Sequence, residues 1–131
     1  MILLDTHALI WWVDGSEKLS KKAKKAISDS IKNGQICISS MTIWEVAVLS
    51  KKGKINFDID FQKWLQKVTS LSMVKIIDVD MQIAHQSVFL PNYLHSDPID
   101  RIIIATAQIL KIPLVTADRR IIKSKIVEVI W

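Results

Sequence analysis

Short apolar segments with strand character alternate with amphipathic segments along this chain. The strand-like segments are Met1-Leu4, Gln35-Ser39, Val74-Ile77, Leu114-Thr116 and Ile126-Ile130. The sequence between them carries helical patterns, and such alternation is typical of strand-helix units whose strands run parallel. Right-handed crossover connections then bring the carboxyl ends of the strands to one edge of the sheet. The chain is therefore expected to form an α/β fold around a mostly parallel sheet.

Helix signals support this expectation. Helices are predicted at Thr6-Val13, Ser20-Asn33, Met41-Lys52, Phe61-Leu71 and Asp80-Leu90, and a further one begins near Pro98. Gly34 and Gly53 follow two of these segments, where a glycine commonly ends a helix, and Gly34 is expected to adopt the left-handed conformation.

Length and composition point to one globular unit. The 131 residues, half of them hydrophobic, suit a single domain spanning residues 1–131. The first apolar stretch, before Asp5, is too short for the hydrophobic region of a signal peptide, and no uninterrupted apolar run approaches a membrane span, so a cytoplasmic protein without membrane contact is expected. Cys37 is the only cysteine, which excludes an internal disulfide and favours a buried small side chain.

Four acidic residues lie beside or within strongly apolar sequence. Asp5 and Asp118 follow two of the strand-like segments, and ligands bind at this edge of open α/β sheets. Glu45 interrupts a helix that is apolar on nearly every side, and Asp100 precedes another buried helical run. Taken singly, each acid has an ordinary explanation as a helix cap, a partner of a helix dipole or half of a salt bridge.

Asp97 and Asp100 compete for one role. Asp97-Pro98 has the pattern of a helix start, with Asp97 as the N-cap and Pro98 at the first helical position. The cap explains Asp97 fully, whereas Asp100 gains only a modest benefit from the helix dipole. Asp100 is therefore the predicted ligand, and participation of Asp97 in the site stays open.

Gathered at one edge, the four carboxylates would repel one another. At a separation of about 5 Å and an effective dielectric near 20, each pair costs about 3 kcal/mol, so such a cluster must take up protons or cations. Because all the donors are oxygens, Mg²⁺ or Mn²⁺ is favoured over zinc. The predicted metal ligands and catalytic residues are Asp5, Glu45, Asp100 and Asp118.

The remaining surface is basic. The chain has a formal charge of +5, and neutralisation of the four acids would leave about +9, which attracts a polyanion or simply keeps the protein soluble. Carboxylates with a divalent metal on a basic protein indicate phosphodiester hydrolysis, in which the metal lowers the pKa of a water molecule. Thr6, Arg101 and Thr116 are weaker candidates for substrate contact, and Arg119, Arg120, His7 and His95 lie near the same positions.

At these residues the sequence resembles the PIN-domain ribonucleases, and in particular the VapC-like toxins of prokaryotic toxin-antitoxin pairs. The segments that carry the resemblance are Asp5-Trp11, Ser40-Ala47, Gly53-Ile55, Ser96-Ala105, Leu114-Asp118 and Val129-Trp131. It implies a metal-dependent endoribonuclease built as a three-layer α/β/α sandwich, with the family's acids at Asp5, Glu45, Asp100 and, at its most variable position, Asp118. It also implies an RNA substrate, a cognate antitoxin and a homodimer.

Two questions stay open at this stage. Adjacent Trp11 and Trp12 cannot face one core from a single helix, so either one is exposed at a partner surface or both are buried between neighbouring elements. The alternative function is a non-catalytic PIN-like domain that binds RNA or regulates. A carboxylate phosphotransferase is disfavoured, because His7 stands where the haloacid-dehalogenase pattern needs a second aspartate.

Overall fold

The computed structural model describes residues 1–131 and contains five strands and seven helices. In chain order they are β1 (Ile2–Leu4), α1 (Thr6–Val13), α2 (Lys21–Asn33), β2 (Ile36–Ser39), α3 (Ser40–Lys51), α4 (Phe61–Thr69), β3 (Val74–Ile77), α5 (Met81–Val88), α6 (Pro98–Leu110), β4 (Leu114–Val115), α7 (Arg119–Ser124) and β5 (Val129–Ile130). No helix has the length and apolar character needed to cross a membrane.

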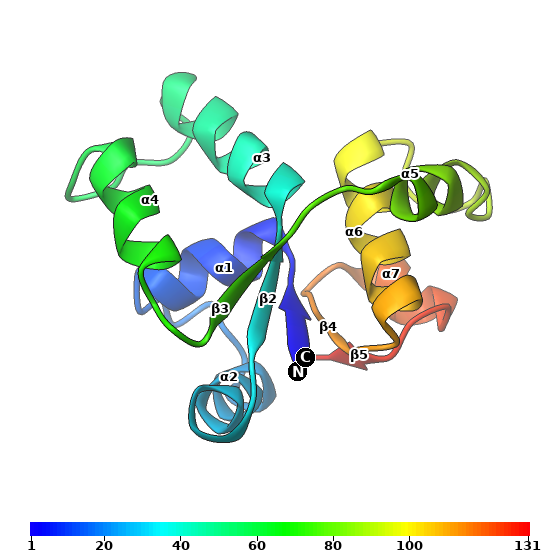
Figure 1. The fold of residues 1–131 in the computed structure, drawn as a ribbon, viewed down its shortest axis with the longest axis horizontal. Coiled ribbons are helices and arrows are strands. Elements are labelled where there is room, and N and C mark those ends of the chain that lie inside the picture. The colour runs from blue at the N-terminus through cyan, green and yellow to red at the C-terminus, as the bar shows by residue number, and fades with distance from the viewer.

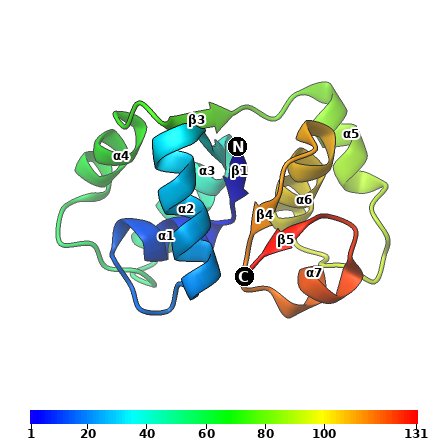
Figure 2. The same cartoon turned by 90° about the horizontal axis from the view of Figure 1, so that it is seen from below.

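The sheet has the strand order β3-β2-β1-β4-β5, and all four neighbouring pairs are parallel. Helices cover both faces: α1 to α4 lie on one side of the strands and α5 to α7 on the other (Figures 1 and 2). The predicted three-layer α/β/α arrangement is confirmed. The strand order reverses direction around β1, which places the carboxyl ends of β1, β2 and β4 side by side.

The two faces of the strands carry separate cores. Ile2 and Leu4 of β1 join the core beneath α1, α2 and α4, whereas Leu3 between them joins the core beneath α6 and α7. This alternation follows from the two-residue period of a strand. Because both faces are buried, β1 and β2 are apolar at nearly every position, which is the pattern of a parallel sheet.

Local expectations hold with two exceptions. Gly53 has a φ of +67°, as a glycine after a helix often does, but Gly34 has a φ of −154° and is extended. The left-handed prediction for Gly34 was therefore wrong, because the chain leaves α2 and enters β2 directly instead of reversing. The predicted last strand is also shorter, since only Val129–Ile130 pairs with β4.

Arg101 of α6 fixes the connection between α5 and α6. Its guanidinium donates hydrogen bonds to five backbone carbonyls of this region, those of Ser87, Val88, Leu90, Pro91 and His95, at 2.7 to 3.4 Å. A planar guanidinium carries five N–H donors, and carbonyls of an irregular segment need donors that secondary structure does not supply. Arg101 thus holds residues 89–97 against the start of α6.

Replacing Arg101 with lysine is expected to lower the stability of the fold by roughly 2–4 kcal/mol, because an ammonium group cannot reach all these carbonyls at once. The melting temperature should fall by roughly 5–15 °C in a calorimetric scan. Arg119→Lys is the matched control, because Arg119 is exposed and its side chain makes no hydrogen bond. Equal melting temperatures for the two variants would show that the Arg101 guanidinium does not stabilise the connection between α5 and α6.

Candidate functional site

The four predicted acids meet in one pocket at the carboxyl edge of the sheet. The pocket has a volume of about 500 Å³. Its lining residues are Asp5, Thr6, His7, Trp11, Glu45, Asp97, Asp100, Ala117, Asp118 and Ile121. The sequence from four distant segments therefore contributes to one site, and the acids are its common feature.

Asp5 and Asp118 are held in place by capping the helices that follow them. Asp5 Oδ1 accepts a hydrogen bond from the Ala8 amide at 2.7 Å, and Asp118 Oδ1 accepts one from the Arg120 amide at 2.8 Å. In both residues the hydrogen bonds to the helix use Oδ1, and Oδ2 remains for another partner. Capping and ligation are therefore compatible in these two residues.

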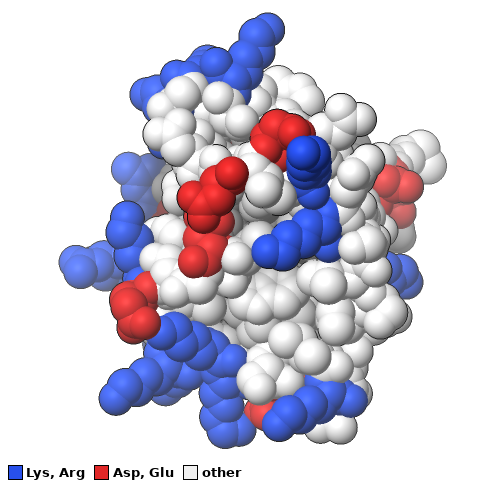
Figure 3. Space-filling view, turned by 90° about the vertical axis from the view of Figure 1, so that its left-hand side faces the viewer, with Lys and Arg blue, Asp and Glu red and all other residues white.

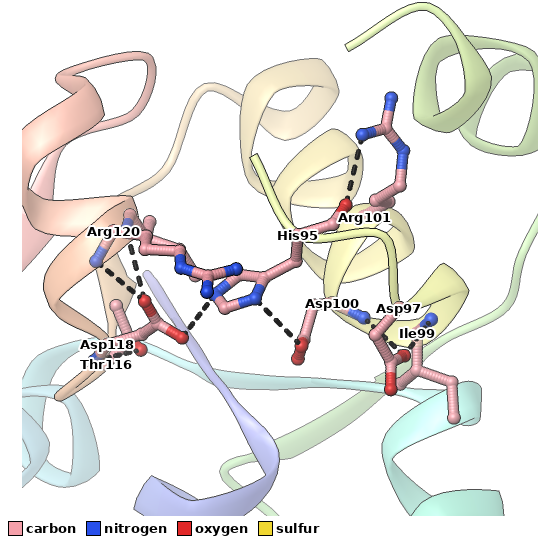
Figure 4. A network of polar contacts seen from close by, with 9 residues as sticks. His95, Asp97, Ile99, Asp100, Arg101, Thr116, Asp118 and Arg120 are labelled. Carbon is pink, nitrogen blue, oxygen red and sulfur yellow. Dashed lines mark hydrogen bonds and ion pairs between the residues drawn. The ribbon is translucent and has the colours of Figure 1, made fainter. Parts of the chain in front are cut away.

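The cap predicted for Asp97 is confirmed, and the assignment of Asp100 as the ligand stays a prediction. Asp97 is the N-cap of α6, and its Oδ1 accepts hydrogen bonds from the amides of Ile99 at 2.8 Å and Asp100 at 3.4 Å. The Asp100 carboxylate has no such bond, and in Figure 4 it points toward the His95 imidazole, whose Nδ1 lies 4.0 Å from its Oδ2. Asp97 nevertheless lines the pocket, so its charge acts on the site even though its hydrogen bonds serve the helix.

Glu45 projects from α3, which packs against α6, and its position brings it close to Asp100. Neither lysine nor arginine forms an ion pair with any of the four acids. Burial, followed by the charges of Asp100 and Asp97, raises the pKa of Glu45 from 4.5 to about 7. Burial and the charge of Asp97 raise the pKa of Asp100 from 3.8 to about 6, and burial also raises the pKa of Asp5.

The His95 imidazole approaches two of these carboxylates closely. Its Nε2 lies 2.5 Å from Asp118 Oδ2, although the angle is not that of a hydrogen bond, and its Nδ1 lies 4.0 Å from Asp100 Oδ2. The imidazole therefore stands between the two carboxylates (Figure 4). His95 belongs to the segment that Arg101 holds, because the Arg101 guanidinium donates a hydrogen bond to the His95 carbonyl.

The two threonines differ in what their hydroxyls do. Thr116 Oγ1 accepts a hydrogen bond from the Asp118 amide at 3.1 Å and so helps to orient that turn. Thr6 is 3% exposed and lines the pocket, but its hydroxyl has no hydrogen-bond partner. The same hydroxyl lowers the pKa of Glu45, so the Glu45 carboxylate is its nearest candidate acceptor within the protein.

The three arginines near the site have different positions. Arg101 does not line the pocket, and its guanidinium is engaged with backbone carbonyls, so the structure favours a structural role over the predicted contact with substrate. Arg119 and Arg120 are exposed at the start of α7, and Arg120 extends from beside Asp118 toward the site (Figure 4).

The donor set fits a hard divalent cation. Four carboxylates and an unpaired hydroxyl supply only oxygen, the donor that Mg²⁺ and Mn²⁺ prefer. No three acidic, histidine or cysteine side chains are arranged to hold an ion as they stand. Binding therefore requires side-chain rotation, and at Asp118 a cation would take the place of the His95 imidazole beside Oδ2.

A second cavity, of about 550 Å³, lies away from this edge between α6 and the C-terminal segment. Glu128 is its only acidic residue, and Gln86 and Gln108 in its wall are hydrogen-bonded to each other. It lacks a cluster of ionisable groups with raised pKa values, which marks the acid pocket as the better candidate for chemistry.

Comparison with known proteins gives a consistent picture. The sequence model of the PIN domain matches residues 2–126. The curated protein Ribonuclease VapC22 of Mycobacterium tuberculosis (strain ATCC 25618 / H37Rv) is 32% identical over 120 residues, which cover 92% of this chain and 88% of that protein.

Solved structures of similar fold include two complexes. A toxin-antitoxin complex from Klebsiella pneumoniae contains a chain that is 29% identical, with a TM-score of 0.70 and coverage of 100% of this chain and 97% of that one. VapBC2 from Rickettsia felis, bound to a promoter DNA fragment, has a TM-score of 0.70 at 21% identity, with coverage of 98% and 97%, and supports the fold alone.

The raised pKa values predict how stability depends on pH without metal. A folded-state pKa above the unfolded value means that the folded protein binds more protons between about pH 4 and 7, so stability falls as the pH rises through that window. Because Asp100 is 35% exposed and screened by solvent, we expect a loss of only about 1–3 kcal/mol, or roughly 3–10 °C in melting temperature.

A thermal-shift series in a chelating buffer from pH 5 to 7.5 measures this loss. Glu45→Gln should flatten the profile and raise the melting temperature at pH 7.5, since it removes a carboxylate but keeps its shape. Added Mg²⁺ or Mn²⁺ should restore the wild-type melting temperature at pH 7.5. If the melting temperature of the wild type depends on pH with the same slope as that of Glu45→Gln, the pKa of Glu45 is not raised in the folded protein.

Proposed function

Because the chain belongs to the PIN-domain family, as its sequence resemblance predicted, we propose that it is a metal-dependent endoribonuclease that acts as the toxin of a toxin-antitoxin pair. The observation that carries the proposal is the pocket in which Asp5, Glu45, Asp100 and Asp118 gather without a lysine or arginine partner. The similarity to a ribonuclease over 92% of the chain supports RNA as the substrate.

The residues of the pocket have distinct roles in this proposal. Asp5 and Asp118 hold a divalent cation through the oxygens that capping leaves free, and Glu45 and Asp100 approach it from α3 and α6. When bound, Mg²⁺ or Mn²⁺ lowers the pKa of a water molecule and stabilises the charge that develops on the phosphate. Thr6 orients water through its otherwise unpaired hydroxyl, and Thr116 keeps Asp118 in position.

The distribution of charge supports a polyanionic substrate. Lysine and arginine side chains gather at the upper and lower ends of the face in Figure 3, the ends at which α3 and α2 lie in Figure 1. The chain has 18 basic and 13 acidic residues, and five of the acids line the pocket. A cation in the pocket would neutralise part of the negative charge of the acids and so favour the approach of RNA phosphates.

Two protein partners belong to the same proposal. A cognate antitoxin is supported by the toxin-antitoxin complex that contains a 29% identical chain. A homodimer would cover the large exposed apolar side chains of α5 and the segment after it, which are Met81, Val88, Phe89 and Tyr93. The proposal includes action in the cytoplasm, where an RNA substrate and an antitoxin would meet the toxin.

A non-catalytic PIN-like domain that binds RNA or regulates is the second candidate. It is favoured by one observation: no three side chains of the pocket are arranged to hold an ion as they stand. In that case the acids would bind a cation weakly or not at all. Stabilisation by metal without RNA cleavage would support this function over the first.

Purified protein is expected to cleave RNA internally with Mg²⁺ or Mn²⁺ and to lose the activity with a chelator. Asp100→Asn and Asp5→Asn should each lower the rate by roughly 10²–10³-fold, as expected for loss of a charged group that stabilises the transition state. Cleavage of a structured RNA is followed by gel electrophoresis, and metal affinity by calorimetry. No cleavage with either metal would contradict the nuclease assignment.

Asp97→Asn is the matched control for this series. Asparagine caps helices as well as aspartate does, so the variant loses one negative charge of the pocket and keeps the N-cap of α6. We expect it to retain metal binding and most of the activity. Loss of metal binding in Asp97→Asn, with retention in Asp100→Asn, would reverse the assignment of these two residues.

The toxin role is tested in cells. Expression of the wild-type chain should arrest growth, and Asp100→Asn should relieve the arrest at an equal protein level, because the arrest depends on cleavage. Co-expression of a small protein encoded by the adjacent upstream gene should also relieve it. Arrest that persists with Asp100→Asn would show that growth inhibition does not come from the acid pocket.

A further inference from the structure

Trp11 and Trp12 of α1 point into different parts of the molecule. Trp11 lines the acid pocket, whereas Trp12 lines a separate small cavity with Lys67, Val68 and Leu71. Neighbouring residues on a helix are about 100° apart, so one helix can present the two indoles to two environments. The structure therefore answers the question left open by the sequence: only one of the pair belongs to the site.

Trp11 is the centre of a row of three rings. The centroid of its ring lies 5.7 Å from that of His7, one turn earlier on α1, and 5.8 Å from that of Trp131 at the end of the chain. Both pairs are tilted by 49°, which is a favourable arrangement for aromatic rings. His7 is exposed and Trp11 is half-buried, so the row runs from the core to the open pocket.

The other aromatic group of this chain shows what a purely structural cluster looks like. Trp64 stacks on Phe57 at 4.7 Å and lies near Phe61 at 6.1 Å, and it is only 2% exposed. That cluster fills the core beneath α4. His7 and Trp11 instead reach the surface beside the carboxylates, and Trp11 is only partly buried against the core.

We propose that His7 and Trp11 form a stacking surface for an unpaired nucleobase of the RNA substrate, next to the phosphate that lies at the acids. The proposal rests on the proposed ribonuclease function and adds the part of the substrate that this wall of the pocket binds. Every base has a π-face, so stacking on aromatic rings binds single-stranded RNA with little dependence on sequence. Contact of Trp11 with Trp131 keeps the indole in place before RNA arrives.

A nucleobase fits this wall better than an apolar side chain of a protein partner. Of the ten lining residues only Trp11, Ala117 and Ile121 are hydrophobic, and the rest are polar or charged. An aliphatic side chain would leave these polar groups without hydrogen bonds, whereas a base offers donors and acceptors at its edge and a flat face to the rings.

The test compares RNA binding by variants of adjacent tryptophans. Fluorescence anisotropy of a labelled single-stranded RNA is measured in a chelating buffer, where no cleavage occurs, for the wild type, Trp11→Leu, Trp11→Phe and Trp12→Leu. Trp11→Leu should weaken binding about 5- to 150-fold, the range expected for one stacked base, and Trp11→Phe should weaken it less. Trp12→Leu should leave the affinity unchanged, because Trp12 lies outside the pocket.

His7→Ala keeps the test decisive if loss of the half-buried indole disturbs the fold. His7 is exposed, so the variant is expected to fold normally, and it should weaken binding of the single strand in the same direction. A duplex of the same sequence, whose bases are already stacked, should bind the wild type, Trp11→Leu and His7→Ala equally well. Circular dichroism and melting temperature verify the fold of each variant.

Several results would overturn the stacking surface. The first is unchanged affinity for the single strand in folded Trp11→Leu and His7→Ala. The second is a loss of affinity in Trp12→Leu as large as that in Trp11→Leu, or a loss for duplex RNA as large as that for the single strand. The third is a Trp11→Leu variant that binds RNA normally and has lost affinity only for the antitoxin. The nuclease proposal is judged separately by adding Mn²⁺. If Trp11→Leu cleaves RNA with the same KM as the wild type, the stacking proposal is overturned and the nuclease proposal stands. If RNA binding depends on Trp11 but the wild type does not cleave, the nuclease proposal is overturned.

Discussion

Electrostatic repulsion among carboxylates at one sheet edge is the constraint on which the rest of this structure depends. The strand order brings the ends of β1, β2 and β4 together, and Asp5, Asp118 and the helix that carries Glu45 follow these strands directly. Burial, followed by the charges of neighbouring acids, raises the pKa values of Glu45 and Asp100 to about 7 and about 6. Such a site is stable in water only when protons or a cation compensate it.

The surrounding structure is built to hold that charge in place. Three of the acids in the pocket, Asp5, Asp97 and Asp118, are N-caps of the helices that follow them, so the positive ends of α1, α6 and α7 point at the site. Capping fixes each backbone and occupies Oδ1. The same hydrogen bonds that stabilise the helices therefore position the ligands, which explains why a cap and a metal ligand need not be different residues.

The segment between α5 and α6 also helps to position the site, which the sequence did not reveal. Arg101 was a candidate for substrate contact because it follows Asp100, but its guanidinium holds five carbonyls of this region. Through the His95 carbonyl it also fixes the residue whose imidazole lies between Asp100 and Asp118. Nothing local in the sequence separates an arginine that binds phosphate from one that binds backbone, since both follow an acid at a helix start.

The sequence by itself determined the parallel α/β sheet, the positions of most helices and strands, and the choice of the four acids, because these depend on periodicity and on charges placed in apolar surroundings. The three-layer sandwich was implied by the family resemblance. The sequence also identified Asp97 as a cap, since the Asp-Pro start is a local signal. Only the tertiary structure decided what lies across the pocket: the unpaired Thr6 hydroxyl, the place of His95, and the separation of Trp11 from Trp12. These are contacts between segments far apart in the chain, and the packing of neighbouring elements fixes them.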